Sequence, residues 1–99
     1  MSVLVKQVED KLCELVRGAA KKAMAAGELP EAELTDFKVE IPADRKNGDY
    51  STNAAMAWAR AFRRAPAMIA AVITKNIDLE GTAFSSCEAA GPGFINFRL

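Results

Sequence analysis

The stretch of sequence that decides the fold is GPGFINFRL, from Gly91 to Leu99. Its Gly-Pro-Gly start is typical of a turn, and the residues after it alternate as in a half-buried strand. Successive side chains of a strand point to opposite faces. We therefore expect one apolar, buried face made of Ile95, Phe97 and Leu99. The opposite face should be open, and it carries Phe94, Asn96 and Arg98.

The segments upstream of this strand predict a small α+β domain that takes in residues 1–99. An amphipathic helix, with apolar residues spaced by three and four, runs from a cap at Ser2 to a stop at Gly27. The later elements are expected at residues 37–41 (strand), 49–52 (strand), 54–62 (helix), from Pro66 (helix) and at 83–90 (strand). Because each strand pair is joined locally, we expect a two-layer α/β arrangement. Its order is helix, two strands, helices, two strands, with a four-stranded, mainly antiparallel sheet and helices on one face.

Local signals set the ends of these elements. Either Thr52 or Asn53 can cap the helix at 54–62, and Trp58 within that helix is expected in the core. Pro66 suits the first position of the next helix, although Ala65 before it is a poor cap.

The composition excludes several classes of function. The chain has 13 lysines and arginines, 13 aspartates and glutamates, and no histidine. A polyanion must therefore be met by a local patch, and Ser-His pairs, Cys-His pairs and histidine-bearing zinc sites are excluded. Asp49, Tyr50 and Ser51 could form an acid–base cluster, but turn and cap chemistry is the simpler interpretation. We find no catalytic constellation and no Gly-rich phosphate loop that opens a helix.

Two further features concern the cellular setting. No apolar run approaches the roughly 20 residues that a membrane helix needs, so no membrane contact is expected. Cys13 and Cys87 lie far apart in the sequence, without a metal-like spacing and without a signal peptide before them. Reduced thiols in a cytoplasmic protein are the expected state.

Two motifs of the chain resemble those of one known family. The first is Gly48-Asp49-Tyr50-Ser51-Thr52-Asn53-Ala54-Ala55, and the second is Gly91-Pro92-Gly93-Phe94-Ile95-Asn96-Phe97. In this order, and separated by a helical segment that contains Pro66, they resemble the N-terminal additional domain of arginyl-tRNA synthetases. The resemblance covers almost the whole chain and implies the same order of helices and strands.

The resemblance also implies a function and a larger context. The domain would be a tRNA-binding accessory module that contacts the D-loop at the elbow of tRNA(Arg) and orients it. A class I catalytic domain, which uses ATP and Mg, would follow in the same chain, so that Leu99 marks a cut at a domain boundary. The fragment itself would hold no cofactor and would not be an enzyme, whereas the parent would be an arginine–tRNA ligase. The expected partners are tRNA(Arg) and that catalytic domain, with no DNA and no membrane.

The open face of the last strand supplies the main candidates for tRNA binding. The ring of Phe94 can stack on an unpaired base, and the amide of Asn96 can donate to and accept from a base edge. The guanidinium of Arg98 can meet a phosphate. By position, Phe94 and Asn96 match the residues with which the family contacts the D-loop. The alternatives are that Phe94 is covered by the missing domain or fills the sheet edge, and that Asn96 is a solvated strand residue.

Further candidates for tRNA binding lie outside this strand. Tyr50 could lie next to the RNA, although a structural role for its motif is simpler. Three arginines form a basic group near the end of the helix at 54–62: Arg60, Arg63 and Arg64. They could face phosphates from one side of the helix, or they could form a solvated helix end. A weaker pair of the same kind is Arg45 and Lys46, in the polar turn that ends with Asn47 and Gly48.

The alternative function is a protein-interaction domain that docks through its open sheet face without RNA contact. Phe94 would then be an apolar anchor of the interface. Replacement of Asn96 by Ala separates the two hypotheses, because only a D-loop contact predicts a changed preference among tRNAs that differ at one loop base.

Overall fold

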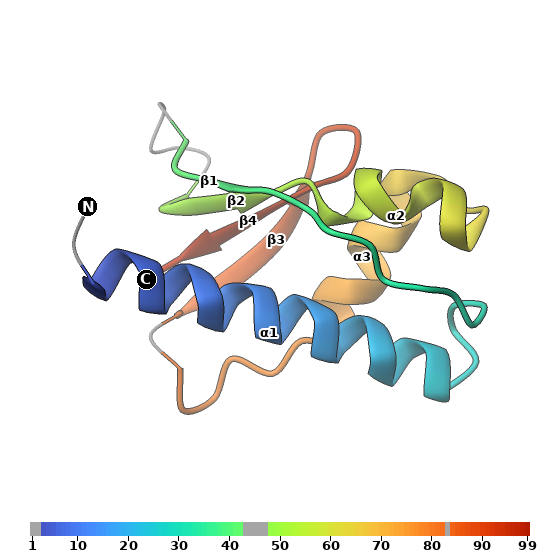
Figure 1. The fold of residues 1–99 in the computed structure, drawn as a ribbon, viewed down its shortest axis with the longest axis horizontal. Helices are drawn as coiled ribbons and strands as arrows, with labels where there is room; N and C mark the ends of the chain where they lie inside the picture. The colour runs from blue at the N-terminus through green and yellow to red at the C-terminus, as the bar shows by residue number, and fades with distance from the viewer. Residues whose placement is uncertain (1–2, 43–47, 83) are drawn as a thin grey trace.

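The computed structural model describes residues 3–42, 48–82 and 84–99, and in this part of the chain it has two layers, one of helices and one of strands (Figure 1). The predicted α+β class is confirmed. The elements, in chain order, are α1 (Val3–Ala25), β1 (Val39–Glu40), β2 (Tyr50–Thr52), α2 (Ala54–Phe62), α3 (Pro66–Asn76), β3 (Ser86–Ala90) and β4 (Phe94–Arg98).

The sheet joins two local strand pairs through its middle. Its order is β1-β2-β4-β3, and every neighbouring pair is antiparallel, as predicted. Ser51 of β2 lies opposite both Glu40 of β1 and Asn96 of β4, and Asn96 also lies opposite Glu88 of β3. Side chains in register share a face of the sheet. One row of side chains therefore crosses all four strands: Glu40, Ser51, Asn96 and Glu88.

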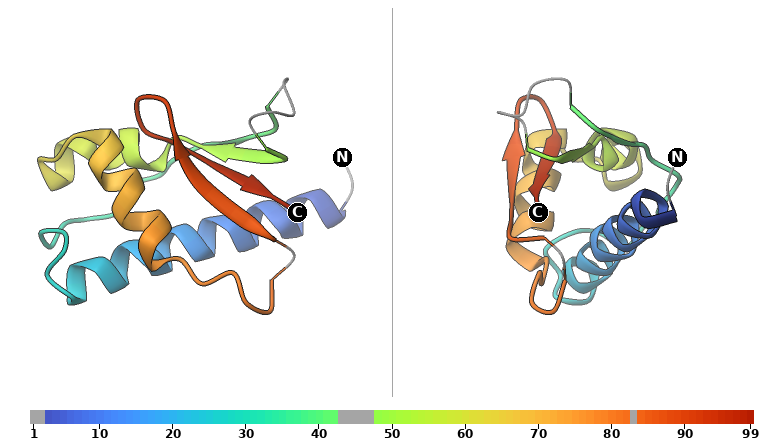
Figure 2. Two further views of the ribbon diagram at one scale, coloured as in Figure 1. Left: turned by 180° about the vertical axis from the view of Figure 1, so that it is seen from behind. Right: turned by 90° about the vertical axis from the view of Figure 1, so that its left-hand side faces the viewer.

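The helices cover the other face of the sheet (Figure 2). α3 packs on β3 and β4, α2 packs on β4, and α1 packs on α3. The largest fully buried side chains come from both layers: Trp58, Phe62, Phe97, Leu12, Ile69, Ile73, Ile95 and Val16. Burial of one large apolar side chain contributes about 1.5–3 kcal/mol, so this interface is the main source of stability.

Trp58 is in the core, as predicted. Its ring packs edge-on against Phe37 and Phe62, with centroid distances of 5.2 and 6.3 Å. Its indole Nε1 donates a hydrogen bond of 2.8 Å to the carbonyl of Thr35, which satisfies the polar atom of a fully buried residue. The segment before β1 is thereby fixed to α2.

The first strand is shorter than predicted, because Lys38 bonds to the side chains of Thr52 and Asn53, just before α2. The backbone N–H of Lys38 donates to Oδ1 of Asn53 over 2.8 Å, and the carbonyl of Lys38 accepts from Thr52 Oγ1 over 2.8 Å. Asn53 occupies the N-cap position of α2 but makes no side-chain cap bond. Thr52 Oγ1 instead accepts from the N–H of Ala54 over 3.3 Å. Of the two predicted caps, Thr52 therefore contacts the helix start, whereas the side chain of Asn53 binds the backbone of Lys38, just before β1.

The two ends of β4 differ from the simple alternation. Ile95 and Phe97 are fully buried, as predicted, but Leu99 is 54% exposed because it lies beyond the last paired residue, Arg98. The N–H of Leu99 donates to Oδ2 of Asp49 over 2.8 Å. The strand predicted from residue 83 begins at Ser86, and residue 83 lies outside the described part of the chain.

The described residues hold neither a membrane-spanning helix nor a metal-binding cluster. No helix there is both long and apolar enough to cross a membrane. Nor do histidine, cysteine, aspartate and glutamate side chains there gather in a group able to hold a metal ion.

Candidate nucleic-acid interface

Phe94 emerges on the open face at the first position of β4, and its side chain is 37% exposed. Its position follows from Gly93, which has a φ of 141°. A Cβ atom on Gly93 would lie 2.5 Å from Cβ of Pro66 and 3.0 Å from Cγ of Met56. The turn can therefore pack directly against the starts of α2 and α3 only because this residue is glycine.

Asn96 lies on the open face, as predicted, but it is only 5% exposed. It sits on an interior strand, so Ser51 and Glu88 flank it across the sheet while Phe94 and Arg98 flank it along β4. The alternative that Asn96 is a solvated strand residue is wrong for this reason. Its Oδ1 accepts a hydrogen bond of 2.9 Å from Ser51 Oγ. In the described part of the chain no fully buried side-chain nitrogen or oxygen lacks a partner, so the remaining amino group of Asn96 keeps contact with solvent.

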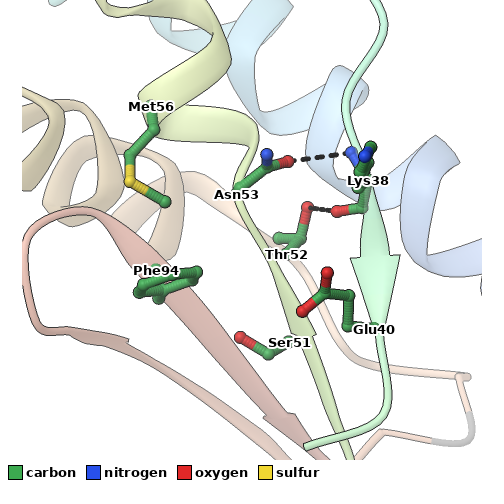
Figure 3. Close-up of a pocket in the computed structure, with 7 residues that line it drawn as sticks. All are labelled: Lys38, Glu40, Ser51, Thr52, Asn53, Met56 and Phe94. Carbon is green, nitrogen blue, oxygen red and sulfur yellow. Dashed lines mark hydrogen bonds between the residues drawn. The ribbon is translucent and has the colours of Figure 1, made fainter.

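A hollow of about 260 Å³ lies beside Phe94 (Figure 3). Phe94 and Met56 form an apolar wall, and Glu40 lies across from them, with Ser51 between. The full lining is Lys38, Glu40, Ser51, Thr52, Asn53, Met56 and Phe94. The residues predicted from the sequence to bind tRNA do not include Met56, Lys38 or Glu40. The alternation of residues 37–41 could have found the last two, because it puts both on the face opposite Val39.

Arg98 is half-buried and has a carboxylate nearby. Its Nη2 lies 3.9 Å from Oε1 of Glu88, and both side chains are partly exposed. An exposed pair of this kind contributes at most about 1 kcal/mol. The negative charges of Glu88 and Glu40 offset the positive charge on this face of the sheet, so the face is no more basic than the rest of the chain. A phosphate contact by Arg98 therefore stays a prediction and would compete with Glu88.

Tyr50 does not lie on the open face. Alternation along β2 turns Ser51 outward and Tyr50 inward, where Tyr50 is 6% exposed and packs edge-on against Phe84 at 6.2 Å. The suggestion that Tyr50 lies next to the RNA is therefore corrected to a core role. Tyr50 therefore points away from Ser51, and Oδ2 of Asp49 accepts a hydrogen bond from the N–H of Leu99, so the structure supports a structural role for this motif rather than an acid–base cluster.

The basic residues near the end of α2 do not share one helix side. Arg60 is on the helix and exposed, one turn after Met56 and so on the same side as this lining residue. The helix ends at Phe62, and Arg63 has a left-handed φ of 54°, which places Arg63 and Arg64 beyond it. Arg64 is exposed, and its Nη1 donates to the carbonyl of Arg63 over 3.2 Å. Arg45 and Lys46 lie outside the described residues.

The motifs and the geometry agree with comparisons to known proteins. Residues 7–99 match the family described as the arginyl tRNA synthetase N terminal domain. The chain belongs to this family. It is 42% identical over 99 residues to the arginine–tRNA ligase of Acetivibrio thermocellus, with all of the chain and 18% of the relative covered. It is 41% identical to that of Ruminiclostridium cellulolyticum (96% of the chain, 18% of the relative). It is 42% identical to that of Staphylococcus aureus (97% and 16%).

The chain spans 16–18% of the length of these relatives. Among the residues predicted to bind tRNA, β4 brings three together on one face: Phe94, Asn96 and Arg98. Arg60 lies on the same side of α2 as Met56, which lines the hollow. Arg64 lies beyond the end of α2, and Tyr50 is in the core.

Proposed function

We propose that this domain binds the D-loop at the elbow of tRNA(Arg) and orients the tRNA for arginylation by the catalytic part of its enzyme in the cytoplasm. One observation carries the proposal: a partly exposed aromatic ring, Phe94, stands beside a hollow of about 260 Å³ on the face of the sheet that the helices leave open. The relatives, which are arginine–tRNA ligases, give the setting. ATP and Mg would be held by the catalytic part, not by this domain.

The described side chains suit an unpaired base better than a paired one. A base stacked on Phe94 gains on the order of 1–3 kcal/mol. The amide of Asn96 is held by Ser51, so its amino group can donate to a base edge from a fixed direction. Since Asn96 is only 5% exposed, a base must enter between Phe94 and Arg98 to reach it. Bases in an A-form helix cannot make this approach, whereas unstacked loop bases can.

Binding by the isolated domain should be weak. The net charge is zero, and two carboxylates stand on the proposed contact face, so few phosphates are neutralised. Each neutralised phosphate adds only about 0.7–0.9 to the slope of log affinity against log salt. Attachment to the rest of the enzyme would convert this contact into useful discrimination through effective concentration. The domain alone should not aminoacylate tRNA.

The test is a titration of the domain with tRNA(Arg) transcripts in which each D-loop base is changed in turn. Binding is measured by NMR from the chemical shifts of the β4 amides. We expect a severalfold preference at one loop base. Asn96→Ala should reduce that preference to within about twofold, and Ser51→Ala, which removes the bond that holds the amide, should reduce it in part. Phe94→Ala should weaken all transcripts alike, by about 5-fold to 100-fold.

Two results would contradict the proposal. One is equal affinity of the unmodified domain for all loop variants. The other is submicromolar affinity for unrelated RNA, because that would mean phosphate binding without base recognition. The protein-docking alternative is not favoured by the family to which the chain belongs.

A further inference from the structure

We infer that Glu40 is a specificity residue of the hollow beside Phe94, and that it selects an unpaired base with an exocyclic amino group over uracil. The inference rests on the proposed function, because it assumes that a loop base enters this hollow. It adds a residue and a base preference that the stacking and amide contacts of β4 do not supply.

The hollow has two chemically different sides. Figure 3 shows the ring of Phe94 and the thioether of Met56 on one side, and the carboxylate of Glu40 turned toward the space between them and Ser51. A flat aromatic ligand with a polar edge fits this division, since its face can lie on Phe94 while its edge meets Glu40.

The backbone that carries Glu40 is firmly held. Glu40 lies opposite Ser51 in the sheet register, and Ser51 in turn bonds Asn96. Two residues before it, Lys38 donates through its backbone N–H to Asn53, the N-cap residue of α2, and accepts through its carbonyl from Thr52 of β2. The backbone of Glu40 therefore stands in a defined relation to that of Asn96, two strands away in the same row.

The carboxylate of Glu40 is available to a ligand. Among the described residues it takes part in no salt bridge, unlike Glu88 in the same row, which lies 3.9 Å from Arg98. Glu40 is exposed, so its charge is stable in water without a protein partner. Lys38 also lines the hollow, and Glu40 offsets its positive charge, so the hollow offers a phosphate no net positive charge. A base is therefore the part of the RNA that fits the hollow better.

The preference for an amino group follows from hydrogen-bond chemistry. An ionised carboxylate only accepts hydrogen bonds. Adenine, cytosine and guanine each present an amino group that donates to it, and glutamate is a known type of acceptor for such a group. Uracil presents an N–H between two carbonyl oxygens, so a carboxylate against this edge also faces an acceptor. Two acceptors brought together out of water lose their hydrogen bonds without replacement.

The test uses four trinucleotides, UAU, UCU, UGU and UUU, titrated into the labelled domain and followed by the amide shifts of Glu40, Ser51 and Phe94. We expect at least one amino-bearing central base to bind about fivefold or more tightly than uracil. Glu40→Gln should abolish this difference or reverse it, because the Gln amide can also donate to a uracil carbonyl. Glu88→Gln is the matched control, since it removes the same charge from the same face outside the hollow, and it should leave the preference unchanged.

Two outcomes overturn the inference. One is a preference that survives Glu40→Gln, and the other is the absence of any preference, or of any binding, in the unmodified domain. The proposed function is tested separately with whole tRNA(Arg). If tRNA shifts the β4 amides with base dependence and Glu40→Gln has no effect, only the role of Glu40 is lost. If tRNA itself shows no base dependence, the proposed function fails with it.

Discussion

Replacement of Gly93 by Ala should destabilise the domain far more than replacement of Gly91, two residues earlier in the same turn. Both residues have positive φ, at 141° for Gly93 and 57° for Gly91. They differ in what a Cβ would meet. At Gly93 it would lie 2.5 Å from Cβ of Pro66, whereas at Gly91 the nearest atom is Cδ2 of Phe94 at 3.7 Å, an ordinary contact.

The expected magnitudes follow from this geometry. Gly91→Ala should cost the left-handed backbone penalty alone, about 1–2 kcal/mol. Gly93→Ala should cost backbone strain of about 1–3 kcal/mol and a similar amount for overpacking, because Pro66 is a rigid ring at the start of α3 and cannot turn aside. The sum, about 2–6 kcal/mol, is a large part of the roughly 5–15 kcal/mol by which a domain of this size is stable.

Urea unfolding followed by circular dichroism measures both variants against the unmodified domain. We expect the loss in free energy of unfolding for Gly93→Ala to exceed that for Gly91→Ala by at least about 1 kcal/mol. A Gly93 variant that is already unfolded without urea agrees with the prediction if Gly91→Ala still folds. Equal losses would refute the reasoning, because they would mean that the turn does not pack against Pro66.

Three further predictions concern the core, one thiol and an ion pair. Trp58→Phe should lower the free energy of unfolding by at least about 1 kcal/mol, since it removes the indole bond to Thr35; unchanged stability in urea would contradict this bond. Burial raises the pKa of the Cys87 thiol, so iodoacetamide at pH 8 should modify this thiol more slowly in the folded domain than in urea. The free energy of unfolding should also fall as the pH rises above about 9, because the thiol ionises first in the unfolded chain. Equal rates would refute this. Hydrogen bonds from Lys75 and Asn76 lower the pKa of Glu28, so its contribution to stability is present above the ordinary pKa of a glutamate and is lost as the pH falls through the lowered value. Lys75→Met should raise the pKa of Glu28, as seen by NMR of the carboxyl carbon, and Lys21→Met is the control.

The order of elements was predictable because each is coded locally. Alternation in residues 94–98 and the Gly-Pro-Gly turn before them gave β4, and Pro66 gave the start of α3. The inward positions of Ile95 and Phe97 followed from the same alternation. Leu99 breaks the rule because burial also requires a paired neighbour, and the strand ends before it.

The degree of exposure of Asn96 was not predictable in this way. Alternation assigns a side chain to a face, but its cover depends on the strands on either side. Asn96 is shielded because β4 lies between β2 and β3, which brings Ser51 and Glu88 next to it. The hollow has the same origin. Glu40, Met56 and Phe94 are far apart in the sequence and meet only through the order of the strands and the position of α2.

The place of β4 in the sheet has a consequence for synthesis. Of the described strands this one is synthesised last, yet it is paired on both sides and supplies two fully buried residues, Ile95 and Phe97. While the ribosome is still making residues 94–98, β2 and β3 have no partner between them and the helices have no sheet centre to cover. The domain should therefore fold in a single late event once this segment has left the exit tunnel, and nascent chains stalled earlier should be exposed to aggregation and to proteases.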